Sequence, residues 1–214
     1  MEDALHEAIS AGRADLVSAH LDRRPDDINS YDGVGLTALH NAVALRHHDA
    51  MMVLLDRGAK LDPISGDGEP PLFVAAKVGN TEAVRCLLER GVSASDREWI
   101  GGQTALHCAA QRGHPDMIPV LFKHGADVEA VDASDQTPMQ AAAWTSNAET
   151  GASITALICL GADVNARTRK NGTALQAAAS EGNIDALNAL LDHGANVAEL
   201  DKRGKSILRD SAMW

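Results

Sequence analysis

The chain has 214 residues and a formal net charge of -11, and 45% of its residues are hydrophobic while only 3% are aromatic. This negative charge disfavours DNA, RNA or an anionic membrane as a partner, because phosphate binding depends on clustered lysine and arginine. No apolar run approaches the roughly 18 residues of a membrane-spanning helix. The acidic N-terminus also lacks the basic and apolar regions of a secretory signal.

Residues 1–29 form a partial structural unit. Ala4, Leu5 and His6 stand where later units carry the motif TALH, and Gly12 closes the short amphipathic segment that they begin. No turn sequence precedes this segment. We therefore predict an N-terminal cap on a larger array of units.

Residues 30–62 contain one complete unit. A turn precedes Thr37, a candidate N-cap, and a short amphipathic helix is predicted over residues 38–45. A second helix is predicted over residues 49–57 and stops at Gly58. Because one helix pair cannot bury its own apolar faces, neighbouring pairs must cover them.

The turn signature of this unit recurs along the rest of the chain. It reads GLTALH, GEPPLF, GQTALH, DQTPMQ and NGTALQ, starting at Gly35, Gly68, Gly102, Asp135 and Asn171. One apolar position follows it at separations of 33, 34, 33, 36 and 33 residues, through Leu39, Leu72, Leu106, Met139, Leu175 and Leu208. A period near 33 residues predicts stacked helical units that share one continuous core.

The pattern resembles the ankyrin repeat over nearly the whole chain. The resemblance rests on TALH at Thr37 and Thr104, LLDRGA at Leu54, HGADV at His124 and LLDHGANV at Leu190. It implies an all-α ankyrin-repeat solenoid of stacked antiparallel helix pairs joined by β-hairpin turns. We predict one domain, 1–214, comprising a capping repeat at 1–29, full repeats at 30–62, 63–95, 96–129, 130–165 and 166–198, and an incomplete C-terminal repeat at 199–214.

The last unit stops after its first predicted helix. Ile207, Leu208 and Met213 would then form an uncovered apolar edge. We expect that the chain is a segment of a longer protein or that a partner covers this edge. The chain is expected to be a monomer unless this C-terminal edge pairs.

Histidines at the TALH position invite a metal-site interpretation, which their spacing argues against. His6, His40 and His107 lie in different units, and counterparts in neighbouring units are about 10 Å apart by ordinary helix packing. A shared metal ion needs ligands near 2 Å, so we predict that these histidines are structural and that no metal is bound.

Three cysteines occupy predicted helices without a CxxC pair. Cys86 and Cys108 are expected to be buried small hydrophobes, and Cys159 to lie nearer the surface. The odd count favours a reduced compartment, the cytoplasm or alternatively the nucleus. No phosphate-binding, metalloprotease or nucleophile motif is supported by its context, so we predict a non-catalytic protein without a cofactor.

Departures from the repeat indicate where a protein or peptide partner would bind. The hairpin before Thr104 is one residue longer than its counterpart, and residues 145–151 contain three extra residues. The resemblance implies binding through hairpin tips and the exposed ends of the first helices, on a concave face. The predicted partner-binding residues are Leu45, Val78, Trp99, Ile100, Arg112, Trp144, Arg169 and Lys170.

Alternatives to this prediction stay open. Trp144 could instead pack on its own extended loop. The chain could be the ankyrin domain of a larger multidomain protein that recruits substrate for a catalytic domain. It could also be a substrate of asparaginyl hydroxylation, because Asn165 and its preceding residues resemble the motif modified in animal ankyrin arrays, and Asn29 lies in a similar context.

Overall fold

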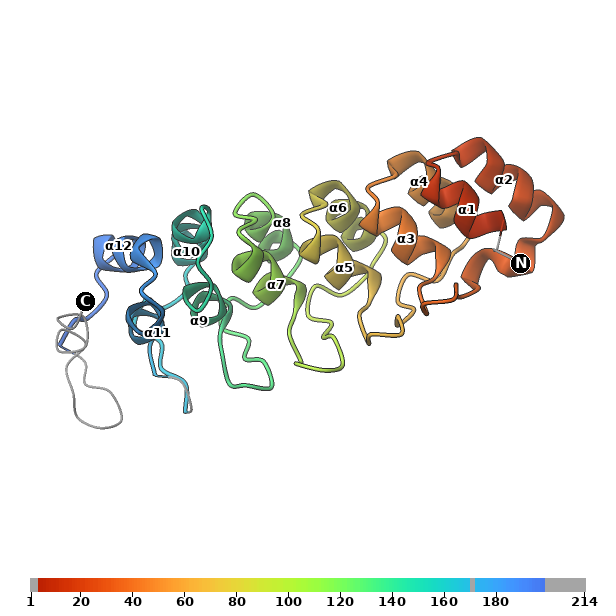
Figure 1. The fold of residues 1–214 in the computed structure, drawn as a ribbon. Helices are drawn as coiled ribbons and strands as arrows, with labels where there is room; N and C mark the ends of the chain where they lie inside the picture. The colour runs from red at the N-terminus through yellow and green to blue at the C-terminus, as the bar shows by residue number, and fades with distance from the viewer. Residues whose placement is uncertain (1–3, 170–171, 199–214) are drawn as a thin grey trace.

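The computed structural model describes residues 4–169 and 172–198. Within them, helix pairs follow one another along an elongated stack (Figure 1), which confirms the predicted all-α solenoid. The pairs are α1 (Ala4–Ser10) with α2 (Ala14–Arg23), α3 (Ala38–Ala44) with α4 (His48–Asp56), α5 (Pro71–Lys77) with α6 (Thr81–Glu89), α7 (Ala105–Arg112) with α8 (Ile118–Lys123), α9 (Pro138–Ala143) with α10 (Thr150–Cys159), and α11 (Ala174–Glu181) with α12 (Ile184–Asp192). A 3₁₀ helix, η1 (Pro25–Asn29), follows α2.

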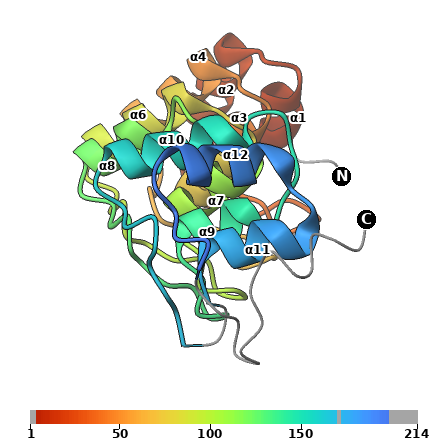
Figure 2. The same ribbon diagram turned by 90° about the vertical axis from the view of Figure 1, so that its left-hand side faces the viewer.

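The helices form two layers, with the loops between pairs gathered on one side. The first helix of each pair lies in one row and the second helix in the other (Figure 1). The view along the stack shows the loops extending together below the row that contains α7, α9 and α11 (Figure 2). These loops are hairpins, three of which contain an isolated β-bridge: Tyr31 with Thr37, Arg97 with Thr104, and Thr168 with Gly172.

The recurring apolar position supplies the centre of the core. Its members in the described residues are buried at the start of each first helix: Leu39, Leu72, Leu106, Met139 and Leu175. Leu208 and the whole predicted unit at 199–214 lie outside the described residues. Because each first helix packs on the first helix of the next pair, the core runs continuously through the stack.

Most first helices begin with a reciprocal capping box. The Thr104 hydroxyl accepts a hydrogen bond from the backbone N–H of His107, while the His107 side chain accepts one from the Thr104 backbone N–H. Threonine fills the same position at Thr37, Thr137 and Thr173. The helix α5 differs, because Pro70 replaces threonine and Pro71 occupies the first turn. Proline has no backbone N–H, but an N–H in the first turn has no partner within the helix, so its absence costs little. The repeated threonine therefore sets where the first helices start.

Arg46 occupies a backbone position that glycine fills in later pairs. It has a φ of 61°, close to the 70° of Gly79 and the 75° of Gly113. Residues other than glycine are strained in this left-handed region of backbone conformation, because their Cβ atom crowds the backbone. The guanidinium of Arg46 also donates to the carbonyl of Gly79 at 2.8 Å.

A pair of substitutions at Arg46 separates these two effects. Arg46→Gly and Arg46→Ala both lose the hydrogen bond, but only alanine keeps a side chain at positive φ. We expect Arg46→Gly to be more stable than Arg46→Ala by about 1 kcal/mol in urea unfolding. Equal unfolding midpoints for the two variants would show that the backbone at this position is not strained.

Candidate interaction surface

A buried glutamate organises the hairpin that carries Trp99 and Ile100. The Glu98 carboxylate accepts hydrogen bonds from the backbone N–H groups of Ile100 at 2.7 Å, Gly101 at 2.5 Å and Gln103 at 3.1 Å. Only 8% of Glu98 is exposed. Three donors on one carboxylate fix the path of this short loop.

Shorter hairpins use aspartate for the same purpose. The Asp32 carboxylate accepts from the N–H groups of Val34 and Leu36 at 3.0 and 2.9 Å. Asp32 stands five residues before its capping threonine, whereas Glu98 stands six residues before Thr104. The extra methylene of glutamate thus accompanies the extra residue of the loop. Glu98 is not among the residues predicted from the sequence, although this spacing is a signal for its role.

Neighbouring hairpins hold the Trp99 hairpin from both sides. The backbone N–H of Trp99 donates to the Gly68 carbonyl at 3.1 Å. A Cβ on Gly68 would lie 2.9 Å from the Trp99 Cβ, so this approach requires glycine. On the other side, the Arg97 guanidinium donates to the Val131 carbonyl at 2.6 Å, and the Ala133 N–H donates to the Gly101 carbonyl at 2.9 Å. The tip is therefore anchored in both directions along the stack.

The anchored tip presents two large apolar side chains to solvent. Trp99 is 74% exposed and Ile100 is 81% exposed. Exposed tryptophan and isoleucine are unfavourable in water unless something covers them. Because the backbone beneath them is already ordered, a partner would lose little entropy in ordering this part of the surface.

A groove of about 450 Å³ adjoins this tip, between the hairpins and the helices α5 and α7. Ile100 and Arg112 both line it, so the structure brings these two predicted residues together. Lys77 and Glu69 form an ion pair at 2.7 Å within the groove. Its further lining residues include Asp67, Phe73, Glu98, Gln103, Cys108 and Gln111.

Leu45, Val78, Trp144 and Arg169, which were also predicted, do not line this groove. Leu45, Val78 and Trp144 each cap the carboxyl end of a first helix, and Arg112 is the last residue of α7. Successive first helices contact one another, so these four positions form a row across the stack. Leu45 is exposed and Val78 is half-buried. Arg169 is exposed on the hairpin before α11, and Lys170 lies outside the described residues.

The longer loop after Trp144 is tied to both neighbouring helix pairs. The Thr145 hydroxyl donates to the Gln111 carbonyl at 3.0 Å, and the Asn147 amide donates to the same carbonyl at 3.1 Å. The Asn183 amide donates to the Thr145 carbonyl at 2.7 Å. Trp144, which is 38% exposed, is therefore positioned next to the end of α7.

Two of the repeated histidines, His40 and His107, each connect their own unit to the next hairpin. The His107 Nδ1 accepts from the Thr104 N–H at 3.3 Å, so its Nε2 carries the proton and donates to the Gln136 carbonyl at 2.9 Å. His40 makes the same contact with the Glu69 carbonyl at 3.0 Å. These bonds are the structural role that the repetition predicted. Burial lowers the pKa of both imidazoles, so the folded protein favours their neutral forms.

Cys108, which lines the groove, has an unreactive thiol. Burial raises the pKa of Cys108 to about 12, so its thiol stays protonated near neutral pH. This agrees with the predicted role of Cys108 as a small hydrophobe. Cys86 is also buried, and Cys159 is exposed, as the sequence analysis expected.

Asn165 and Asn29, the two possible hydroxylation sites, each accept a backbone hydrogen bond from the following unit. The Asn165 side-chain carbonyl accepts from the Asn196 N–H at 2.8 Å, and the Asn29 side-chain carbonyl accepts from the Lys60 N–H at 2.9 Å. Both contacts cross to the following unit. They give each asparagine a role in the scaffold, and modification of either residue stays a prediction.

Comparison with known proteins identifies similar sequences and folds. A family model described as "Ankyrin repeats (3 copies)" matches residues 5–98 and 95–167, and one described as "Ankyrin repeat" matches residues 171–202. The "Ankyrin repeat protein nuc-2" of Neurospora crassa is 32% identical over 87% of this chain and 17% of its own length. Human "Ankyrin repeat and SOCS box protein 6" is 34% identical over 64% of this chain and 34% of its own length.

Solved structures show the same architecture. The human ASB11 ankyrin repeat domain has a TM-score of 0.83 and 27% identity, covering 98% of this chain and 91% of that domain. The ankyrin repeat domain of Bcl-3 has a TM-score of 0.82 and 24% identity, covering 98% of this chain and 93% of that chain. The chain spans only a minor part of the curated relatives above. Among the described residues, no helix has both the length and the apolar character needed to cross a membrane.

Proposed function

This chain belongs to the ankyrin repeat family, and from that premise we propose that it binds a partner protein or peptide across the hairpins and first helices of the α5–α6, α7–α8 and α9–α10 pairs. Ankyrin repeats are protein–protein interaction domains, and their fold is generally non-catalytic. The observation that supports this placement is the anchored tip of Trp99 and Ile100, directly beside a groove that Ile100 and Arg112 line. Large side chains on an ordered backbone are typical interface anchors.

The charges in the groove suggest what the partner segment contains. Glu69 is paired with Lys77, and the Glu98 carboxylate is used by its own hairpin. Arg112 is exposed at the groove, where its guanidinium can form two parallel hydrogen bonds with a carboxylate. We therefore expect a segment that places an apolar side chain on the tip and an acidic side chain at Arg112. Trp144 would extend the contact along the row of helix ends.

The test uses peptides selected from a random display library on the immobilised chain. Trp99→Ala should weaken the selected peptides by about 30-fold, the loss expected at an interface hot spot of about 2 kcal/mol. Arg112→Ala should weaken mainly those peptides that carry an acidic residue. The measurement is fluorescence anisotropy of labelled peptides, after circular dichroism shows that each variant is folded.

Leu191→Ala provides the matched control, because Leu191 is an exposed leucine on α12 in the other layer of helices. It should leave binding unchanged. Peptides that bind equally to wild type, Trp99→Ala and Trp144→Ala would show that the interface lies elsewhere on the array.

A recruiting role within a larger protein is a second candidate. It is favoured by the small share of the relatives' length that the chain spans, 17% and 34% in the two cases above. An intracellular location is part of the proposal, because the cysteines are free thiols and reduced thiols persist in the cytosol and nucleus. A monomeric state is proposed as well. The predicted apolar edge at residues 199–214, which could pair, lies outside the described residues.

A further inference from the structure

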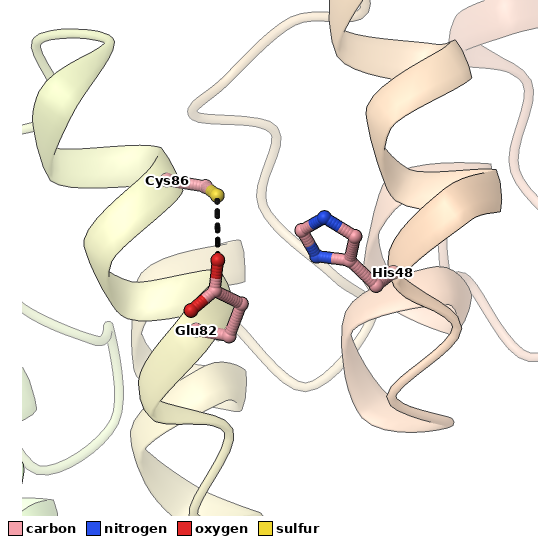
Figure 3. A group of neighbouring side chains, drawn as sticks. All are labelled: His48, Glu82 and Cys86. Carbon is pink, nitrogen blue, oxygen red and sulfur yellow. Dashed lines mark hydrogen bonds between the residues drawn. The ribbon is translucent and has the colours of Figure 1, made fainter.

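Three side chains with metal-binding atoms meet on the second layer of helices, where α4 lies beside α6 (Figure 3). Glu82 and Cys86 are one turn apart on α6, so both project from the same face of that helix. His48, the first residue of α4, points toward them from the preceding helix pair. One ligand atom from each side chain, a nitrogen, an oxygen and a sulfur, lies within 4.8 Å of the other two.

We propose that His48, Glu82 and Cys86 bind a zinc ion. Zinc bonds of about 2.0–2.3 Å to nitrogen, oxygen and sulfur place tetrahedral ligand atoms roughly 3.3–3.8 Å apart. The side chains therefore need to move by only about 1 Å to close around an ion. His48 and Glu82 are exposed and can change rotamer, while the buried Cys86 holds its sulfur in place.

The chemistry of the three groups favours zinc over magnesium or calcium. Magnesium and calcium prefer oxygen ligands, whereas a thiolate and an imidazole suit a borderline ion such as zinc. The Cys86 thiol would release its proton to solvent on binding, because the thiolate is the ligand. Three protein ligands leave a fourth position for water or for a side chain of a bound partner.

The charged side chains that act on Cys86 include two carboxylates and one guanidinium. Glu82 and Glu89 both contribute negative charge at Cys86, and Arg90 contributes positive charge. The Arg90 guanidinium is directed to Asp56 of α4 at 3.3 Å and to the Cys86 carbonyl at 3.4 Å. Within the cluster itself, the Cys86 sulfur lies 3.9 Å from the Glu82 carboxylate. A weak thiol–carboxylate hydrogen bond without metal is the competing explanation.

The site would act between helix pairs and away from the proposed partner surface. Its ligands come from α4 and α6, whereas the groove is lined from the hairpins and from α5 and α7. A bound ion would fasten two neighbouring pairs in the second layer. Zinc binding at this cluster therefore does not depend on the proposed partner surface.

The test uses cobalt(II) as a spectroscopic probe for zinc, in a Cys159→Ser background that removes the exposed thiol. We expect a thiolate-to-cobalt charge-transfer band in the near ultraviolet that saturates at one ion per chain and disappears when Zn²⁺ is added. Zn²⁺ should also raise the thermal unfolding midpoint, because the folded protein holds the three ligands together and binds the ion more tightly than the unfolded chain does.

Variants of the ligands separate the site from incidental binding. Cys86→Ala should abolish the charge-transfer band, and His48→Ala or Glu82→Gln should weaken cobalt binding at least about tenfold. Glu181→Gln is the matched control, because it removes an exposed carboxylate from α11, a helix that carries none of the three ligands, and it should bind cobalt like the background protein. The proposal is overturned by an absent band, by a band that survives in Cys86→Ala, or by an unfolding midpoint that Zn²⁺ does not raise.

Discussion

Replacing His107 by alanine should lower the free energy of unfolding by about 2–4 kcal/mol, whereas His107→Gln should cost less than about 1 kcal/mol. Alanine leaves a cavity in a fully buried site and removes the acceptor of the Thr104 N–H, which is itself buried. It also removes the bond from the imidazole to the Gln136 carbonyl. A buried N–H donor that loses its acceptor still incurs the full free-energy cost of its desolvation, with no hydrogen bond to offset it.

Glutamine should be a functional substitute for His107, because the next repeat of this chain carries a glutamine at the equivalent position. The Gln140 side chain accepts from the Thr137 N–H at 2.9 Å and donates to the Gly172 carbonyl at 2.7 Å. These are the same two contacts that His107 makes. Urea unfolding followed by circular dichroism measures the difference, with the urea dependence compared among variants to check that unfolding stays cooperative. Equal stability of the alanine and glutamine variants would show that the bridge contributes nothing.

The free energy of unfolding should fall as the pH is lowered below about 6.5, through His40 and His107. Burial lowers the pKa of both imidazoles in the folded state, although Glu69 and Asp32 near His40 and Asp132 near His107 partly oppose this. Below the unfolded pKa the unfolded chain binds protons that the folded chain does not, so acid favours unfolding. The stability is complete above the unfolded pKa and is lost as pH falls toward the folded pKa. Each histidine contributes up to about 1.4 kcal/mol per pH unit in that window.

The double variant His40→Gln/His107→Gln should lose most of this pH dependence while keeping its stability near pH 7.5. Partial desolvation raises the pKa of the Asp96 and Glu129 carboxyls, which acts in the opposite direction at lower pH, but both groups are common to the two proteins and cancel in the difference. His193→Gln, on an exposed histidine, is the control and should leave the pH dependence largely unchanged. If the double variant showed the same loss as wild type between pH 6.5 and 5, other groups would be responsible.

The sequence predicted the helices well because their signals are local. Thr37 and Thr104 cap first helices where predicted, and the helices predicted at 38–45 and 49–57 agree with α3 and α4 to within one residue. N-caps, glycine stops and apolar periodicity act within a few residues, so one unit suffices to recognise them. The unit boundaries as a whole, including the one at residue 199, stay a prediction.

The candidate surface was only partly accessible from the sequence. The extra residue in its hairpin indicates the position of Trp99, but only the folded hairpin brings three backbone N–H groups together around the Glu98 carboxylate. The longer loop after Trp144 was recognised by length alone. Its bonds to Gln111 and Asn183 depend on the neighbouring helix pairs and have no local sequence signal.

By itself the sequence determined the type of unit and its period, because capping, turn chemistry and the recurring apolar position repeat along one chain. Only the tertiary structure decided which side chains of different units meet. Ile100 and Arg112 come together in a groove, and His48 approaches Glu82 from 34 residues away. Such meetings depend on how stacked helices superimpose and on which rotamers their neighbours permit, and neither is encoded within a single repeat.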